Sequence, residues 1–527
     1  MLSLPALPLA DARRIVFLLS TLLALMPCET RGKDVSTEYR DSSERQMEAI
    51  DELCQATANT VLFSGAVLIG IDGQVAYKRG FGLANREWNN PNTTDTKFRL
   101  ASVSKPFCSV VVLQLVQQGK LKLSDKITDW LPAYRNDTGG KISVHHLLAH
   151  QSGLRDFTAD YKYRSSTSRL SFGKDEFIEQ HCSNDLLHEP GTMYSYCNAG
   201  YIILGRIIEK VTHKTFEQNL QARIFQPIGM VNSGFDRNRY VLPKRASGYT
   251  LSPFETENAQ YMDMDSSPGA AGALYSTVED LFRFNKALRS EELLNKKFHK
   301  LMLTPNRDVP EAKAAGGRPK STYGYGWNIF SRVHPVTKYR VRMVTHGGAI
   351  NGFRAMMTLL PDQNVFVVVL CNQADPPGSS QVWSSIQRLS RELLHIATSQ
   401  PYRLPPKPAL SQDQRMYEII KMDGLGKAIK WFEGNGREAA WGGTHQTVAK
   451  QLFKDGLIQQ GLALMAYDVE LTPDKVWLLR ATARAHLDYG QHGAALQYAT
   501  QGLKQKSHDA RLLAIRNEAE REINRGN

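Results

Sequence analysis

The chain has 527 residues, of which 42% are hydrophobic and 22% charged, and its formal net charge is +13. This composition excludes a fibrous or largely disordered protein, and the length exceeds what one hydrophobic core usually organises, so we expect at least two domains. The net positive charge would be compatible with nucleic acid or an anionic membrane as a binding partner. However, basic residues form no long block and acidic residues are interspersed throughout. We therefore expect a diffusely basic surface and no nucleic-acid partner.

The first thirty residues have the pattern of an export signal. Arg13 and Arg14 precede an apolar run over residues 15–26, which has the length of a signal-peptide core and is short for a membrane span. We expect residues 1–28 to be a signal peptide and the protein to be periplasmic or secreted; a buried helix of the folded domain is the alternative. Cys28 leaves an N-terminal lipid tether open, although the small residues of a lipidation signal are missing before it. No later segment is apolar for long enough to predict a transmembrane domain in the mature protein.

Two β-hairpins are predicted, one near each end of the first large domain. Residues 65–71 and 74–77 flank Asp72-Gly73, a pair that suits a tight two-residue turn. Residues 353–360 and 365–371 form the second pair, and the latter run is apolar enough for a fully buried strand. Because the segments between them are mostly helical and loop-like, we expect an α+β domain whose two ends meet in one sheet.

The chain is expected to divide at two linkers. A polar linker over residues 29–44 precedes the α+β domain at 45–398. Four prolines fall between positions 401 and 408, which indicates a stiff linker over residues 399–412. Residues 413–527 then form a helical domain.

The helical domain carries a repeat. Ala449 and Ala483 lie 34 residues apart, as do Gly456 and Gly490. This spacing resembles tetratricopeptide repeats, in which small residues let paired helices approach closely. The match is partial, because Gly461 stands where the second unit has an alanine, and a generic helical tail is the alternative. Such a module could bind a protein partner.

A Ser-x-x-Lys motif supplies the first chemical signal. Ser102-Val-Ser-Lys105 is followed by apolar residues at helical spacing up to Gly119, so Ser102 lies at a helix start with its backbone N–H free for an oxyanion. Lys105, three residues on, lies on the same helical face and can reach the hydroxyl. A buried lysine with a lowered pKa can activate a serine. The second match, Ser171-Phe-Gly-Lys174, lacks this frame and is expected to be a surface loop.

Two more segments complete the candidate site. Tyr196-Cys197-Asn198 offers a phenol whose pKa an adjacent lysine ammonium would lower, which makes Tyr196 a candidate general base. His346-Gly347-Gly348-Ala349 directly precedes the last strand pair, and its glycines would let the backbone run close to a substrate. The N–H of Ala349 would be the second oxyanion donor.

These three elements, in this order, resemble the serine β-lactamase/penicillin-binding-protein superfamily in its class C-like branch, over about residues 45–395. The resemblance implies an antiparallel sheet flanked by helices, with a helical subdomain. It also implies Ser102 as the acylated nucleophile, Lys105 as its proton partner and Tyr196 as the general base. The other implied site residues bind substrate (Asn198, His346, Gly348) or form the oxyanion hole (N–H groups of Ser102 and Ala349). Further segments that match the family are 146–154, 227–230, 271–280 and 323–327.

No metal and no organic cofactor is implied. His145, His146 and His150 could be taken for a metal cluster, but their segment is a structural turn in the family. Cys197 lies between two candidate residues and has no dedicated base among its neighbours, so we expect a packing role.

One departure from the family bears on the substrate. The third motif of dedicated β-lactamases is Lys-Thr-Gly, whose first two side chains grip the substrate carboxylate, and here His346 and Gly347 replace them. Histidine is largely neutral at pH 7 and glycine has no hydroxyl, so carboxylate recognition should be weaker. The sequence thus favours a D-amino-acid-directed peptidase or amidase, or a carboxylesterase. A true β-lactamase and a non-catalytic ligand sensor with a partner-binding helical tail are the alternatives.

Overall fold

The structure is a computed structural model, and the chain divides into two units between Ala49 and Ile50. The predicted signal peptide lies outside the described residues, and helix α2 (Val35–Asn59) begins inside the predicted linker at 29–44. None of the helices described is long and apolar enough to cross a membrane. The structure describes residues 35–266, 268–306, 322–333, 340–375, 380–406, 410–435 and 444–526.

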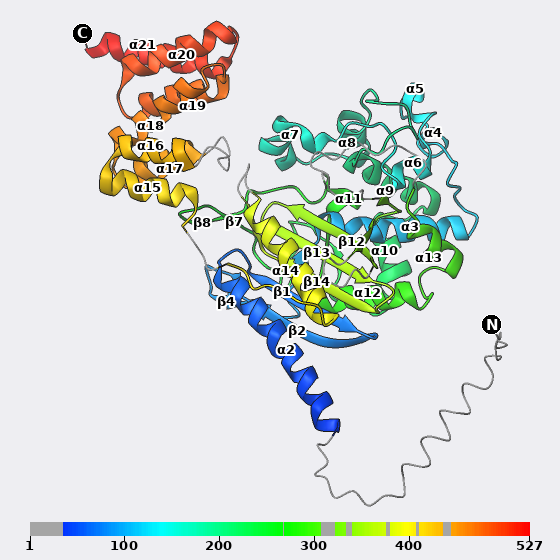
Figure 1. The fold of residues 1–527 in the computed structure, drawn as a ribbon. Helices are drawn as coiled ribbons and strands as arrows, with labels where there is room; N and C mark the ends of the chain where they lie inside the picture. The colour runs from blue at the N-terminus through cyan, green and yellow to red at the C-terminus, as the bar shows by residue number, and fades with distance from the viewer. Residues whose placement is uncertain are drawn as a thin grey trace, which may run out of the picture. The chain divides into compact units, whose positions relative to one another are not determined.

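Both predicted hairpins are confirmed, and they meet in one seven-stranded antiparallel sheet (Figure 1). In the first hairpin, Asp72 and Gly73 have φ angles of 50° and 76°, the left-handed conformation that an Asp-Gly turn supplies. The two ends of the domain join where Gly65 pairs with Cys371 and Ile71 with Val365. The strand order is β10 (Thr322–Tyr323), β11 (Asn328–Val333), β12 (Arg340–Ile350), β13 (Phe353–Leu360), β14 (Val365–Cys371), β1 (Gly65–Ile71) and β2 (Gln74–Phe81).

Helices cover both faces of this sheet. As a consequence, every residue of the central strand β14 is buried. Phe366 on one face contacts Phe282 of α12 (Val278–Arg289), with ring centroids 6.0 Å apart. On the other face, α14 (Gln381–Ala397) lies over β13 and β14, where the Ser390 and Thr358 hydroxyls are 3.4 Å apart (Figure 1). The α12 face belongs to the main hydrophobic core, which also contains the helices after Ser102.

The segment between the two hairpins contributes β10, β11 and β12 to the large sheet and otherwise forms helices and small sheets, one of which includes β15 from after the second hairpin. The sheets are β3 (Leu83–Asn85) with β4 (Asn90–Pro91); β5 (Phe98–Arg99), β9 (Leu274–Ser276) and β6 (Gly234–Phe235); and β15 (Gln373–Ala374), β7 (Tyr249–Leu251) and β8 (Thr256–Asn258). The helices are α3 (Lys105–Gln117), α4 (Ile127–Trp130), α5 (Asn136–Gly139), α6 (Val144–Leu148), α7 (Tyr161–Ser165), α8 (Lys174–His181), α9 (Asn198–Thr212), α10 (Phe216–Leu220), α11 (Gly269–Gly272) and α13 (Lys296–Met302).

The described residues from 412 to 526 form seven helices joined by short turns, and positions 34 apart occupy equivalent places. Ala449 and Ala483 are fully buried, and Gly456 and Gly490 both adopt left-handed φ angles between helices. The first unit has Gly461 where the second has an alanine, because a Cβ at position 461 would overlap the Phe453 ring. These pairs are consistent with the predicted repeat. The helices are α15 (Gln412–Asp423), α16 (Leu425–Asn435), α17 (Thr444–Lys454), α18 (Ile458–Leu471), α19 (Val476–Asp488), α20 (His492–Gln505) and α21 (Ala510–Gly526).

Strand β12 packs tightly against the turn before Ser102. A Cβ on Gly348 would overlap the Leu100 carbonyl oxygen, and one on Gly347 would lie 2.5 Å from the Trp383 ring. The two glycines therefore let the strand pack closely on the protein itself, and their close approach to a substrate stays a prediction.

We expect Gly348→Ala to lower the free energy of unfolding by about 2 kcal/mol, because the new methyl group overpacks a contact with rigid backbone. Urea denaturation measures this. The matched control is Gly493→Ala, at an exposed helical position with no atom near the added Cβ. That variant should lose nothing and gain at most about 1 kcal/mol. Equal effects of the two substitutions would contradict the packing argument.

Candidate functional site

Ser102 occupies the second position of a 3₁₀ turn, η1 (Ala101–Ser104), that leads directly into α3. Its N–H therefore has no acceptor within the helix, as the sequence predicted. Ala101 has a φ of 49°, an uncommon left-handed conformation for a residue with a side chain. Ser104, the other serine of the motif, accepts a hydrogen bond from Leu274 N–H at 3.1 Å and is structural. The half-buried Ser102 alone presents its hydroxyl to Lys105.

Lys105 is completely buried, and its amine has three oxygen partners. Nζ lies 3.1 Å from Ser102 Oγ, 2.7 Å from Asn198 Oδ1 and 2.9 Å from the Ala271 carbonyl oxygen. The Asn198 and Ala271 oxygens can only accept hydrogen bonds. A neutral amine would give its two protons to these two acceptors, which leaves the nitrogen lone pair for the Ser102 hydroxyl.

The electrostatics favour that neutral amine. Burial is the main cause that lowers the pKa of Lys105 to about 7, and the charge of Asp156 partly opposes it. Near neutral pH a large fraction of the amine is therefore unprotonated, which is the form that can take up the serine proton. The lowered pKa expected from the sequence is confirmed.

Tyr196 lies against the same amine, with Nζ 4.9 Å from its ring centroid. The phenol hydrogen-bonds Ser102, but burial dominates and raises the pKa of Tyr196 above its ordinary value. The expectation that the lysine ammonium lowers this pKa was wrong, since burial of the phenol outweighs any such effect. Tyr196 is a neutral phenol at pH 7, which can donate and accept a proton but is a poor primary base.

Asn198 begins α9 and bridges Lys105 to a residue that the sequence did not single out. Its Nδ2 donates to Asp156 Oδ2 at 3.0 Å and Oδ1 at 3.3 Å, while its Oδ1 accepts from Lys105. Asp156 caps the short helix η2 (Phe157–Ala159) by accepting from Thr158 N–H at 3.1 Å. Nothing in the sequence distinguished Asp156 from other loop aspartates, because its role depends on tertiary packing.

His346 is 2% exposed on β12 and forms a wall beside Tyr196, their ring centroids 6.4 Å apart. Burial first, and Lys105 second, lower the pKa of His346 to about 3, so the ring is neutral at pH 7. Its Nε2 is 3.0 Å from Tyr323 Oη and its Nδ1 is 2.8 Å from the Gly347 carbonyl oxygen. Both ring nitrogens thus have protein partners. The neutral histidine predicted from the sequence is confirmed.

The remaining expectations concern neighbouring positions. Ala349 is exposed next to Gly348, whose contact with Leu100 brings β12 to the turn that carries Ser102. Cys197 is buried, and burial raises the pKa of its thiol to about 12, which fits a packing role.

The histidines near position 150 have structural partners. His150 Nδ1 accepts from Cys197 N–H at 3.1 Å, His146 Nδ1 accepts from Ser143 N–H at 3.2 Å, and His145 Nδ1 lies 2.7 Å from Tyr325 Oη. In the part of the chain that the structure describes, no group of three His, Cys, Asp or Glu residues is arranged to hold a metal ion.

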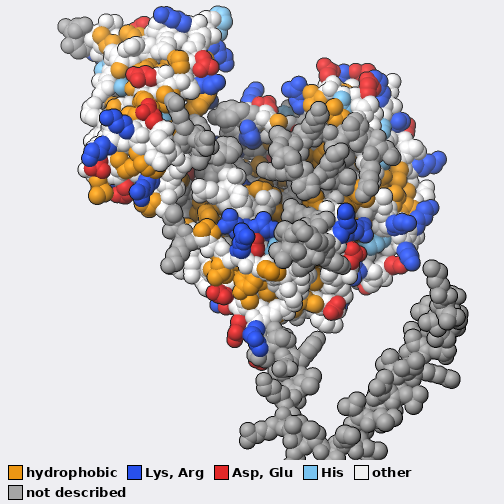
Figure 2. All heavy atoms as spheres, viewed as in Figure 1, with side chains coloured by type: hydrophobic (Ala, Val, Ile, Leu, Met, Phe, Trp, Pro, Cys, Tyr) orange, Lys and Arg blue, Asp and Glu red, His pale blue; other side chains and the backbone are white. Residues whose placement is uncertain are grey.

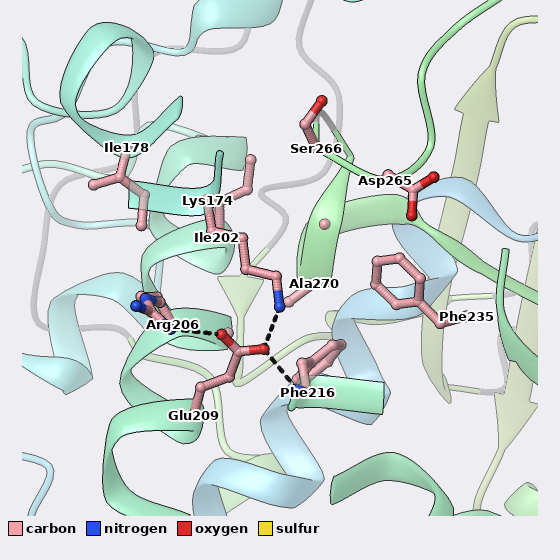
Figure 3. Close-up of a pocket in the computed structure, with 12 residues that line it drawn as sticks. Lys174, Ile178, Ile202, Arg206, Glu209, Phe216, Phe235, Asp265, Ser266 and Ala270 are labelled. Atoms are coloured by element: carbon pink, nitrogen blue, oxygen red, sulfur yellow. Dashed lines mark hydrogen bonds and ion pairs between the residues drawn. The ribbon is translucent and has the colours of Figure 1, made fainter. Parts of the chain in front are cut away.

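The second Ser-x-x-Lys match lies at a different place. Ser171 is exposed, and Lys174 lines a small pocket, where its Nζ is 2.6 Å from Glu209 Oε1 (Figure 3). Glu209 also accepts from Arg206 and from Phe216 N–H, so this pocket contains a satisfied ion-pair cluster. The surface position expected for Ser171 is confirmed.

On the face shown in Figure 2, Lys and Arg side chains are interspersed with Asp and Glu.

Comparison with known proteins agrees with this geometry. Residues 50–390 match the family described as Beta-lactamase. Penicillin-binding protein 4* of Bacillus subtilis (strain 168) is 28% identical over 362 residues, which cover 66% of this chain and 75% of that protein. Esterase EstB of Burkholderia gladioli is 28% identical over 267 residues, 45% of this chain and 68% of the esterase. The D-amino acid amidase of Ochrobactrum anthropi SV3 has the same fold, with a TM-score of 0.56 at 23% identity over 68% of this chain and 98% of the amidase.

The pKa of Lys105 predicts a pH-dependent stability. In the unfolded chain the amine keeps its ordinary pKa of 10.5, whereas in the folded state the pKa is about 7. Between these values the unfolded state binds more protons, so stability rises with pH. From pH 7 to pH 9, wild type should gain about 2 kcal/mol of unfolding free energy relative to Lys105→Met. Urea denaturation of both proteins at both pH values measures this, and a difference that stays constant with pH would contradict the assignment.

Proposed function

This chain belongs to the beta-lactamase family of serine hydrolases, and on that basis we propose that it cleaves neutral esters or D-amino-acid amides and peptides through an acyl-enzyme on Ser102. The observation that carries the proposal is the buried amine of Lys105. Two of its three partners are obligate acceptors, and the third is the Ser102 hydroxyl. The esterase among the relatives is consistent with this substrate class.

The proposed reaction has two steps. The Ser102 Oγ attacks the substrate carbonyl carbon while its proton passes to the neutral Lys105 amine. Tyr196, a neutral phenol beside both groups, gives its hydroxyl proton to the leaving alcohol or amine as the carbonyl–leaving-group bond breaks and takes up the proton held by Lys105, so both residues are neutral again. Water then adds to the ester on Ser102 while Lys105 takes its proton, and that proton returns to Ser102 Oγ as the acyl–oxygen bond breaks. In this assignment Lys105 is the base, and Tyr196 relays the proton instead of acting as the general base that the sequence suggested.

The wall opposite Tyr196 determines which substrates fit. His346 is neutral at pH 7 and both its ring nitrogens are occupied, and Gly347 offers no hydroxyl. Neither residue can hold a substrate carboxylate in the way that a lysine and a threonine would. Neutral substrates should therefore be favoured over β-lactams, whose recognition depends on a carboxylate.

Covalent labelling tests the nucleophile. A fluorophosphonate should label wild type, and the labelling rate should rise with pH through about 7 as Lys105 loses its proton. Ser102→Ala should not be labelled, whereas Ser171→Ala, at the exposed second motif, should be labelled like wild type. Mass spectrometry of the adduct locates the modified residue. An adduct elsewhere, or none in wild type, would refute the proposal.

A matched pair of esters tests the substrate class. p-Nitrophenyl butyrate and mono-p-nitrophenyl succinate carry similar acyl chains, but only the second has a free carboxylate. An ion-paired carboxylate would raise kcat/KM by about tenfold or more. We expect no such gain, and a slower reaction with nitrocefin than with p-nitrophenyl butyrate or D-alanyl p-nitroanilide. A tenfold preference for the succinate would overturn the assignment of a neutral wall.

A further inference from the structure

Among the described residues, one carboxylate acts on Lys105, and it is linked to the amine through an amide side chain. Lys105 has no ion-pair partner among the described residues. Its nearest carboxylate influence comes from Asp156, which binds the Nδ2 side of the Asn198 amide while Lys105 binds the Oδ1 side. The carboxylate, the amide and the amine are thus joined by successive hydrogen bonds, an arrangement called the relay below.

The relay fixes which way the Asn198 amide faces. An amide can rotate so that either its oxygen or its nitrogen faces the lysine, and only the oxygen can accept a proton from the amine. Asp156 accepts from Nδ2 with both carboxylate oxygens, and the Thr158 hydroxyl lies 3.4 Å from the same nitrogen. These contacts hold the oxygen toward Lys105.

The carboxylate itself is held by the core. Asp156 caps η2, whose Phe157 side chain is 7% exposed and makes edge-to-face contacts with Phe177 and Tyr163, at centroid distances of 5.3 and 4.7 Å. The position of Asp156 therefore does not depend on a mobile surface contact.

Other titratable groups around Lys105 are neutral near pH 7. Burial raises the pKa values of the phenols and thiols and lowers those of the histidines, so all are pushed toward their uncharged forms. These groups are Cys108 on the same helix, Tyr196, Cys197 and Tyr201 at or beside the start of α9, His150 after α6, and His346 on β12. Asp156 is the only carboxylate among the described groups that act on the amine.

We propose that Asp156 is a positioning residue which, through the Asn198 amide, orients the Lys105 amine toward Ser102 and sets the pH range in which that amine acts as a base. The inference rests on the proposed function and adds a second residue that controls it. A direct ion pair would keep the lysine protonated, whereas a site with no negative charge would favour a weak base that loses its proton at low pH. The relay places the pKa of Lys105 between these two cases, because Asp156 acts on the amine only through the Asn198 amide.

The test compares the pH dependence of fluorophosphonate labelling in wild type, Asp156→Asn and Asp156→Ser. Asparagine keeps an oxygen for the Asn198 amide and for the η2 cap but removes the charge. Serine also caps helices well, and serves if the asparagine variant does not fold. The labelling rate falls on the acidic side of its pH profile, where Lys105 becomes protonated, and this fall is called the acidic limb. Loss of the Asp156 charge should move the acidic limb to lower pH by about one unit. The rate at pH 6, relative to each protein's own plateau, should then rise from about one-tenth to about one-half.

The control is Asp185→Asn, which removes a carboxylate whose side chain is 90% exposed and pairs with Arg135. Its limb should coincide with that of wild type. Thermal unfolding verifies that each variant is folded, and a purely structural role of Asp156 would lower the plateau without moving the limb. Suppose that the labelling rate of wild type falls on the acidic side near pH 7, and that the folded Asp156 variants show this fall at the same or a higher pH. The inference about Asp156 is then overturned, and the proposed function stands. A wild-type rate without that limb overturns both.

Discussion

The burial of a single amine is the constraint on which this site depends. Removing an amine from water is costly, and the protein offsets that cost with hydrogen bonds between the amine and three oxygen atoms; no described residue forms a direct ion pair with it. Each oxygen comes from a different element: Ser102 from the turn before α3, Asn198 from the start of α9, and Ala271 from α11. The geometry that makes the lysine reactive is therefore also the geometry that holds these three elements together.

The aromatic and histidine side chains around the amine serve the same end. Tyr196, Tyr323 and His346 exclude water and remain uncharged, so they preserve the low dielectric that the lysine requires. A cationic third-motif lysine would add a second positive charge to this wall and would depress the pKa of Lys105 further. The neutral histidine avoids that repulsion, and its consequence is a wall without a grip for anionic substrates.

Local sequence patterns predicted the parts of the site that are encoded locally. Ser102 and Lys105 share one helical turn, Asp72-Gly73 determines its own turn, and the short segments around Tyr196 and His346 were assigned through the family resemblance. What the sequence did not reveal depends on distant packing. Asp156 meets Asn198 across 42 residues, the direction of the Tyr196 pKa follows from burial, and the need for Gly348 arises from the Leu100 carbonyl. These contacts and burial effects depend on residues far apart in the sequence, so no short sequence pattern can predict them.

The positions of the Lys105 partners in the sequence determine when, during synthesis and folding, the environment of the amine can form. Asn198 and Ala271 lie 93 and 166 residues after the lysine, and the central strands β1 and β14 pair across most of the domain. During synthesis these segments emerge long after Lys105 does, and long-range pairing of this kind forms late. Until then the amine remains hydrated, with the basicity of any exposed lysine. The nascent chain therefore carries no activated serine, and hydrolytic chemistry begins only when the domain has closed around the amine.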